Sequence, residues 1–293
     1  YYASRGLGDV YKRQLFQVPH HFFRKEAQKC GQILPAEGDY GVAMLFFPQD
    51  DKGVEDARRV FEEGCAEAGV PLLFWREMPV DPHDLGETAR ACMPTILQAF
   101  LGRPDDTPAG DAFERRLYVC RRTIEKKADA EFALRDKIFY VCSMSSRTIV
   151  YKGMLVATQM RRFFIDLNDA AVKTAVALVH SRYSTNTTPS WERAHPNRFI
   201  IHNGEINTLK GNVNWIRARE PNLYSPVLQH DLERVMPIIN REGSDSAILD
   251  NVLEFLVMNG RPLTRAASML LPEPWDHDDN LSEERRAYDA YQS

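Results

Sequence analysis

Three short segments in the second half of the chain carry residues suited to binding an amino acid. Arg182 follows an apolar run, and a guanidinium at a strand end can hold a carboxylate through two parallel hydrogen bonds. Asn203 and Gly204 follow a second apolar run and offer amide donors of the kind that stabilise an oxyanion. Asp245 stands just before a predicted helix and offers an acceptor for an ammonium group. Together these residue types can hold a small amino acid and stabilise a tetrahedral oxyanion.

Each of these residues also has an ordinary structural interpretation. An isolated arginine is commonly a surface residue paired with an acid. An Asn-Gly dipeptide is a strong tight-turn signal, because glycine tolerates positive φ. Asp245 can cap the following helix, as can its neighbours Ser244 and Ser246, since these side chains accept hydrogen bonds from the free N–H groups of a first helical turn. The residue types alone leave both interpretations open.

The order of these motifs resembles a known family. HSRYSTNT at residues 180–187, HNGEINTLKGN at 202–212 and EGSDS at 242–246 are similar to the glutaminase domain (class II glutamine amidotransferase) of glutamate synthase large subunits. LFQVPHHFF, from Leu15, is similar to the family's Leu-x-x-x-Pro-His-x-Phe-Phe segment. The YKGM segment at residues 151–154 and the extension to Trp215 favour glutamate synthase over purine, glucosamine-phosphate or asparagine pathway amidotransferases.

The resemblance implies a role for each candidate residue. Arg182 binds the α-carboxylate of L-glutamine and Asp245 binds its α-ammonium group. The side-chain amide of Asn203 and the backbone N–H of Gly204 form the oxyanion hole. The remaining residues predicted for the substrate site are Thr185, Gly243 and Ser244.

The implied reaction is hydrolysis of glutamine to glutamate and ammonia through a cysteinyl thioester. The family's nucleophile is a cysteine that begins the mature chain in a Cys-Gly-x-Gly context, where its own α-amino group serves as general base. That context and the family's His-Arg-Gly motif are both missing here, and five cysteines are present: Cys30, Cys65, Cys92, Cys120 and Cys142. We therefore expect a fragment, truncated at both ends, that is inactive alone. The alternative is a nucleophile-less module that binds glutamine or docks to partners.

Further partners and cofactors follow only from the resemblance. Ammonia is expected to pass to a downstream synthase domain of the same polypeptide, where 2-oxoglutarate is aminated and reduced with FMN and an iron–sulfur cluster. Neither cofactor is expected in this segment, because its cysteines lack cluster spacing. A small subunit or ferredoxin is a further expected partner. His180, His195 and His202 lack metal-ligand spacing, so no metal site is predicted.

Composition excludes several other classes. The 293 residues are 44% hydrophobic and 27% charged, which is ordinary for a globular protein. A net charge of −4 gives no reason to expect nucleic acid or a membrane surface as partner. No run reaches the roughly 18 apolar residues of a membrane span. Five cysteines without a C-x-x-C pair fit buried free thiols in a cytoplasmic enzyme.

The elements that must position these residues are predicted from hydrophobic periodicity. Strands are predicted at residues 40–47 (covered on both faces), 72–77, 138–144, 147–153, 174–180 and 198–202. Ser145 and Ser146 are predicted to join two of them in a tight hairpin, and the 174–180 strand is expected to be buried. Helices are predicted at residues 54–68, 87–100, 113–127, 206–216 and 248–256, the last closed by Asn259 and Gly260.

One further helix feature concerns charge. Six basic residues at helical spacing predict a solvated helix face: Arg115, Arg116, Arg121, Arg122, Lys126 and Lys127.

The domain organisation is predicted to be simple. Residues 1–14 match nothing in the family and are interpreted as a non-native tail, and residues 15–293 as one partial amidotransferase domain. Periodicity supports a mixed α and β fold. The resemblance implies an α+β fold, an incomplete four-layer α/β/β/α sandwich of the Ntn-hydrolase type.

Overall fold

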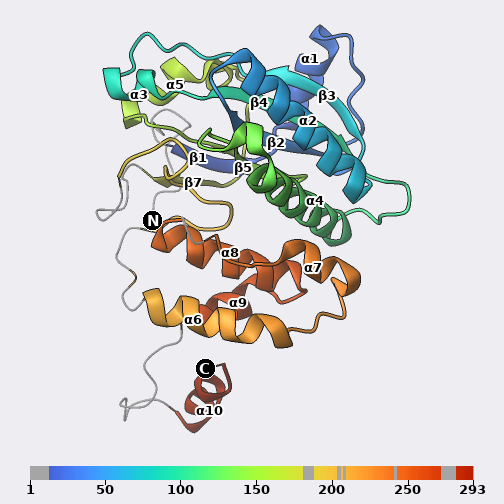
Figure 1. The fold of residues 1–293 in the computed structure, drawn as a ribbon, viewed down its shortest axis with the longest axis vertical. Helices are drawn as coiled ribbons and strands as arrows, with labels where there is room; N and C mark the ends of the chain where they lie inside the picture. Colours follow the sequence, from blue (N-terminus) through green and yellow to red (C-terminus); the bar gives the residue numbers. More distant parts are fainter. Residues whose placement is uncertain are drawn as a thin grey trace. The chain divides into compact units, whose positions relative to one another are not determined.

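A computed structural model describes residues 13–180, 188–202, 206, 209–240, 243–271 and 282–292. The chain divides into two compact units, Tyr1–Glu205 and Ile206–Ser293 (Figure 1). Each unit is described by itself.

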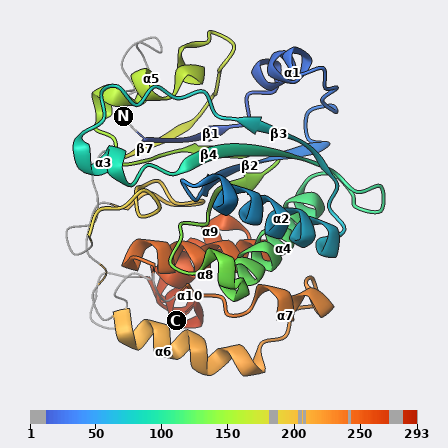
Figure 2. The ribbon, with the colours of Figure 1, turned by 45° about the horizontal axis from the view of Figure 1, so that its top comes forward.

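The first unit contains two antiparallel sheets (Figures 1 and 2). The four-stranded sheet has the order β3 (Leu72–Glu77), β4 (Thr95–Gly102), β2 (Tyr40–Phe47) and β5 (Tyr140–Ser145). The three-stranded sheet has the order β6 (Thr148–Tyr151), β1 (Arg13–Gln17) and β7 (Ala177–His180). Strand β1 thus includes the last two residues of the segment interpreted as a non-native tail.

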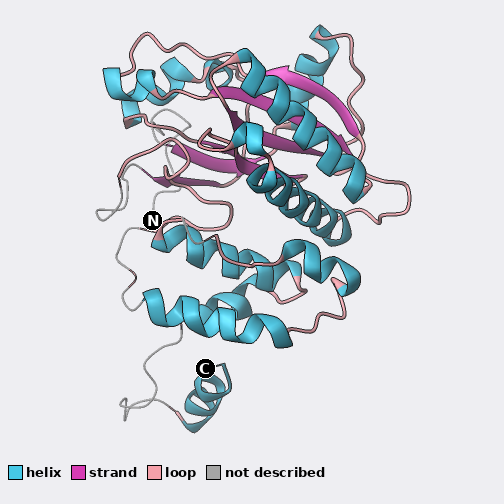
Figure 3. Cartoon of the chain, viewed as in Figure 1, coloured by secondary structure: helices cyan, strands magenta, loops and turns pink. Residues whose placement is uncertain are grey.

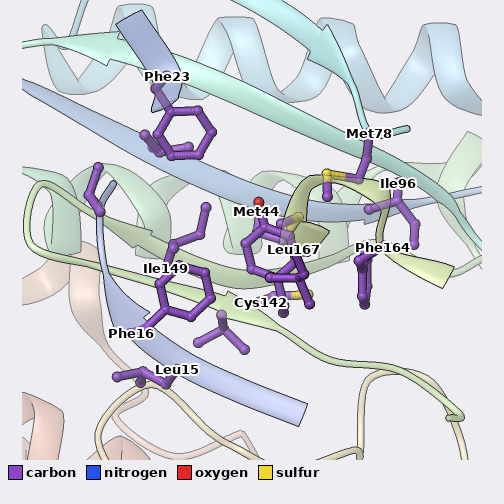
Figure 4. Close-up of a cluster of buried hydrophobic side chains, with 14 of the residues drawn as sticks. Leu15, Phe16, Phe23, Met44, Met78, Ile96, Cys142, Ile149, Phe164 and Leu167 are labelled. Atoms are coloured by element: carbon purple, nitrogen blue, oxygen red, sulfur yellow. The ribbon is translucent and has the colours of Figure 1, made fainter. Parts of the chain in front are cut away.

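Strand β2 contributes side chains to the hydrophobic cores on both faces of its sheet. Every one of its residues is buried, which confirms the strand predicted to be covered on both faces. Because side chains alternate along a strand, Val42, Met44 and Phe46 join the core between the two sheets. Ala43, Leu45 and Phe47 join a second core on the opposite face. Figure 4 shows the first core, where Phe16 and Ile149 lie with Met44 and Ile96.

Helices α2 (Asp51–Ala68) and α4 (Asp111–Ala130) lie side by side and cover the outer face of the four-stranded sheet (Figure 3). Helix α2 begins where the Asp50 carboxylate accepts the Gly53 N–H at 2.8 Å, and it ends at Gly69, whose φ of 65° suits glycine. The smaller helical elements of this unit are α1 (His20–Lys29), α3 (Glu87–Ala91), α5 (Met160–Phe163), η1 (Phe132–Leu134), η2 (Ala157–Gln159) and η3 (Ile165–Asn168).

The described part of the second unit is helical. Its elements are α6 (Leu209–Arg219), η4 (Glu220–Asn222), η5 (Gln229–Asp231), α7 (Leu232–Val235), α8 (Asp245–Met258), α9 (Leu263–Leu270) and α10 (Glu283–Gln292). Helix α8 packs against α9 and buries Ile248, Val252 and Phe255. It ends at Asn259, and Gly260 follows with a φ of 87°, as the sequence predicted.

The predicted helix over residues 87–100 is wrong, because α3 ends at Ala91 and β4 begins at Thr95. A proline at position 94 disfavours helical backbone at the residue before it. Strand β4 is the neighbour of both β2 and β3, and its residues are buried on both faces. A strand of this kind shows no alternation of apolar and polar residues, so periodicity alone does not separate it from a helix.

The predicted hairpin around Ser145 and Ser146 is also wrong. Both strands form, yet β5 pairs with β2 and β6 pairs with β1, so the chain crosses from one sheet to the other. The buried Glu114 carboxylate holds the crossing, because it accepts Ser145 Oγ–H at 2.8 Å and the Ser146 N–H at 2.7 Å.

Two strand predictions near the candidate site need correction. Strand β7 begins only at Ala177 and lies at a sheet edge, and Val176 is 64% exposed, so the predicted buried strand is short and partly open. Residues 198–202 form no strand and are half-buried or exposed. The solvated helix face is wrong for Arg121 and Arg122, which are buried on α4.

Candidate functional site

The predicted site residues divide into two groups. Arg182, Thr185, Asn203 and Gly204 lie outside the described residues, so their roles stay predictions. Gly243, Ser244 and Asp245 lie within the described residues, at the start of α8.

Ser244 is the cap of α8. Its hydroxyl accepts the Ala247 N–H at 3.2 Å, and its side chain is buried. Asp245 is the first residue of the helix, where we had expected it to stand just before the helix. Because Ser244 takes the capping role, the Asp245 carboxylate is available for other partners.

The Asp245 carboxylate connects the start of α8 to the segment that follows the Asn-Gly pair. Its Oδ2 accepts the Ile206 N–H at 3.1 Å, and Ile206 comes two residues after Gly204 in the sequence. Its Oδ1 accepts the N–H and the hydroxyl of Ser246 at 2.7 and 3.2 Å. A carboxylate has about four acceptor sites, and three of its bonds come from described residues.

Gly243 lies just before the cap of α8 and contacts Asn240. Its N–H donates to Asn240 O at 3.2 Å, and a Cβ at this position would lie 3.1 Å from that oxygen and 3.2 Å from the Ala247 side chain. The Asn240 N–H donates in turn to Asn251 Oδ1 at 3.0 Å. A side chain at position 243 would therefore disturb contacts that hold Asn240 near α8.

Residues 188–202 connect two segments that lie outside the described residues, 181–187 and 203–205, and they form neither helix nor strand. Trp191 is fully buried, and its Nε1–H donates to Ala89 O at 3.1 Å. Lys152, at the end of β6, is 1% exposed and donates to Glu192 O at 2.9 Å. Arg198 Nη2 donates to Val141 O at 2.7 Å.

Sequence reasoning did not assign Lys152 a role. The YKGM segment served only as a family marker. The sequence feature that could have indicated Lys152 is a lysine directly after the apolar residues of a strand.

The histidines and cysteines offer no metal centre in the part of the chain that is described. The rings of His180 and His195 lie 4.7 Å apart and are buried. No three His, Cys, Asp or Glu side chains among the described residues are grouped to hold a metal ion. A hollow of about 540 Å³ beside α1 includes His20, Arg24 and Lys173 and none of the predicted site residues.

The five cysteines differ in environment. Cys30 and Cys92 are exposed, which corrects the expectation of buried thiols at those two positions. Burial raises the pKa of the Cys142 thiol to about 12. The hydrogen bond from Cys120 to Cys65 and burial raise the pKa of Cys120 well above its ordinary value. These two thiols are poor nucleophiles, since the thiolate is the reactive form.

Within the described residues, the helices are too short or too polar to cross a membrane.

Comparison with known proteins identifies the class. Residues 12–293 match the family described as Glutamine amidotransferases class-II. The chain therefore belongs to the class II glutamine amidotransferase family. This match and the two antiparallel sheets confirm the predicted family and its α+β fold of the Ntn-hydrolase type.

Curated relatives narrow the resemblance to glutamate synthases. The chain is 45% identical over 279 residues to the NADPH glutamate synthase large chain of Bacillus subtilis (95% of this chain, 18% of the relative). It is 42% identical over 280 residues to an NADH glutamate synthase of Schizosaccharomyces pombe (92% and 13%). It is 39% identical over 265 residues to the chloroplastic ferredoxin-dependent glutamate synthase of Oryza sativa subsp. japonica (90% and 16%). The chain thus spans less than a fifth of the length of these relatives.

Proposed function

We propose that this chain is the glutamine-binding part of a glutaminase that supplies ammonia to a glutamate synthase. One observation carries the proposal: the Asp245 carboxylate, fixed at the start of α8, also accepts the N–H of Ile206. Two of the three predicted motifs therefore approach each other around this carboxylate. The family match and the glutamate synthase relatives support the same function.

The proposed binding roles use the two charged groups on the α-carbon of glutamine. Arg182 holds the α-carboxylate of glutamine through two parallel bonds, and Asp245 accepts a hydrogen bond from the α-ammonium group. Hydrogen bonds to charged groups contribute about 1.5–3 kcal/mol each. Thr185, Gly243 and Ser244 complete the proposed substrate site.

The proposed chemistry takes place at the side-chain amide of glutamine. A cysteine thiolate attacks the amide carbon, and the oxyanion that forms accepts hydrogen bonds from the Asn203 amide and the Gly204 N–H. The carbon–nitrogen bond breaks as the nitrogen takes a proton and leaves as ammonia, and water then hydrolyses the thioester to glutamate. Loss of one oxyanion donor costs about 2.7–4 kcal/mol of transition-state stabilisation.

We propose that none of the five cysteines in this chain is that nucleophile, so the chain binds glutamine without hydrolysing it. Cys120 and Cys142 are buried with raised pKa values, and no cysteine has the family's Cys-Gly-x-Gly context. The same observations favour the second candidate function, a glutamine-binding or docking module without chemistry of its own.

We propose that ammonia is used in a synthase domain of the same polypeptide, with 2-oxoglutarate as acceptor and ferredoxin or a nicotinamide as electron donor. Two relatives are named for NADPH and ferredoxin, respectively. FMN and an iron–sulfur cluster belong to that domain in this proposal. Cys65 on α2 and Cys120 on α4 are buried with their sulfurs 3.9 Å apart and do not fit a cluster.

Calorimetric titration of the chain with L-glutamine tests the binding roles. We expect Arg182→Lys to raise the Kd at least about tenfold, because lysine cannot replace two parallel bonds. Asp245→Asn should have a similar effect, because it removes the negative charge. Arg59→Lys is the matched control, because Arg59 lies on the exposed side of α2. Equal Kd values for the Arg182 and Arg59 variants would contradict the carboxylate assignment.

A further inference from the structure

We propose that Lys152 is a positioning residue for the glutamine site. Its buried ammonium fixes the backbone of residues 188–202 through the Glu192 carbonyl, and Asn203 and Gly204 follow that segment directly in the chain. The proposal rests on the function proposed above, because Lys152 acts on glutamine only through this segment.

The segment needs anchoring because it has no regular structure of its own. Residues 188–202 form neither helix nor strand, so no ladder of backbone hydrogen bonds fixes them. Even so, Trp191 and His195 are 1% exposed and Ala194 is fully buried. Side-chain contacts with neighbouring elements therefore contribute to where this backbone lies.

Lys152 makes two hydrogen bonds at the end of β6. Its Nζ donates to the Tyr140 hydroxyl at 3.0 Å and to Glu192 O at 2.9 Å, and it lies 4.5 Å from the centre of the Tyr140 ring. Both acceptors are uncharged. Burying an ammonium is costly, and an apolar side chain of similar volume often serves stability as well or better. What a lysine adds at this position is a directed bond to one backbone carbonyl.

Two further contacts hold the segment on either side of that bond. The Trp191 ring meets Phe46 edge-on with centroids 5.8 Å apart, and it packs so closely on Gly153 that a Cβ there would lie 2.4 Å from Trp191 Cζ3. Arg198 Nη2 donates to Val141 O and lies 3.1 Å from Glu125 Oε1. The segment is thus fastened to β5 and β6 before the chain reaches Asn203.

The consequence for the site is geometric. Groups that bind a ligand must be held within about 0.5 Å of their productive positions by the residues that support them. A loss of anchoring at Glu192 should therefore weaken glutamine binding more than it weakens the fold.

The test compares three variants of the full chain by calorimetric titration with L-glutamine and by thermal unfolding. Lys152→Met keeps the volume and removes both bonds, and we expect it to raise the Kd at least about tenfold. Lys152→Arg can still donate to Glu192 O and should restore most of the affinity. Tyr140→Phe removes one acceptor but leaves the Glu192 bond, so its Kd should stay within about twofold of the unchanged chain. A Lys152→Met variant with unchanged Kd overturns the proposal, as does an equal loss in Tyr140→Phe.

Hydrogen–deuterium exchange gives a readout that does not depend on glutamine. In Lys152→Met, the backbone amides of residues 188–202 should exchange faster, while those of α2 and α4 keep their rates. If the amides of α2 and α4 exchange faster by the same factor, Lys152 has only a general structural role and the proposal is overturned. If Lys152→Met does not fold, Gly153→Ala replaces it, because the added Cβ displaces Trp191. An unchanged Kd in a folded Gly153→Ala chain would also overturn it.

The two proposals fail in different ways. If the unchanged chain does not bind glutamine, the proposed function fails, and the exchange experiment still tests the anchoring. If the unchanged chain binds and Arg182→Lys weakens binding while Lys152→Met does not, only the role of Lys152 fails.

Discussion

Glu125 shows how a single side chain can be misread from its sequence neighbours. It accepts hydrogen bonds from Arg121 at 2.7 Å and Arg122 at 2.6 Å, and Arg198 lies 3.1 Å away. Burial raises the pKa of Glu125, but the three guanidinium groups outweigh burial and hold the pKa at about 2. The predicted solvated face is therefore a buried ion cluster at these positions.

The stability of the chain should depend on the ionisation of Glu125. A carboxylate whose pKa is depressed in the folded state stabilises the fold above its ordinary pKa, and the stabilisation is lost as the pH falls from about 4.5 toward 2. We expect Glu125→Gln to lower the free energy of unfolding by about 3 kcal/mol at pH 7, and by progressively less below about pH 4.5. Urea unfolding at a series of pH values measures the difference.

The exposed Glu55 on α2 provides a control for that series. Glu55→Gln should change the free energy of unfolding by less than about 0.5 kcal/mol at every pH. If the difference between the unchanged chain and Glu125→Gln does not vary with pH, the ion cluster contributes no ionisation-linked stability.

At the candidate site, the sequence predicts those side-chain roles that depend only on neighbouring residues. Ser244 is the cap that a Gly-Ser-Asp-Ser segment can supply, and Asp245 keeps a carboxylate directed at other groups. Lys152 was missed because its role depends on burial and on a carbonyl forty residues later in the chain. Neither property is visible in the residues around it.

Among the secondary-structure elements, those with a clear period or with turn residues at both ends were predicted correctly. Helix α2 buries residues three or four positions apart, as its apolar spacing predicted. Strands β2 and β3 are bounded by turn residues. Residues 95–102 are apolar on both faces, so their pattern fits either state. The hairpin failed for another reason: neighbouring strands in the sequence can belong to different sheets, and only long-range pairing with β1 and β2 decides which.

The contact between α2 and α4 offers a test of how closely these helices approach. A Cβ at Gly64 would lie 2.4 Å from Ile124 Cγ1 and 3.1 Å from Ile124 Cα. Alanine favours a helix interior over glycine by about 1 kcal/mol, but overpacking costs about 1–3 kcal/mol. We therefore expect Gly64→Ala to lower the free energy of unfolding by up to about 2 kcal/mol, measured by urea unfolding.

Gly86→Ala is the matched control, because a Cβ at that position meets no atom within 4 Å. It should change stability by less than about 0.5 kcal/mol. Equal stability of the two variants would mean that the helices can separate without cost.

For the chain in its entirety, the proposed lack of a nucleophile gives a direct prediction. The 293-residue chain should release no ammonia from L-glutamine above a no-protein control, even where calorimetry detects binding. The proposed reason is that none of the five cysteines has the Cys-Gly-x-Gly context of the family's nucleophile. If ammonia is released, replacing Cys30 and Cys92 with serine, singly, will show whether an exposed thiol is responsible.

Strand β1 lies at the centre of its sheet, where Gln14 pairs with Tyr151 and Arg13 pairs with His180. During synthesis, this early strand emerges long before either of its neighbours exists. Contacts so distant in sequence slow folding, and an unpaired strand that exposes Leu15 and Phe16 is prone to aggregate until its neighbours are made. The ribosome-bound chain should therefore depend on chaperones until residue 180 has been translated.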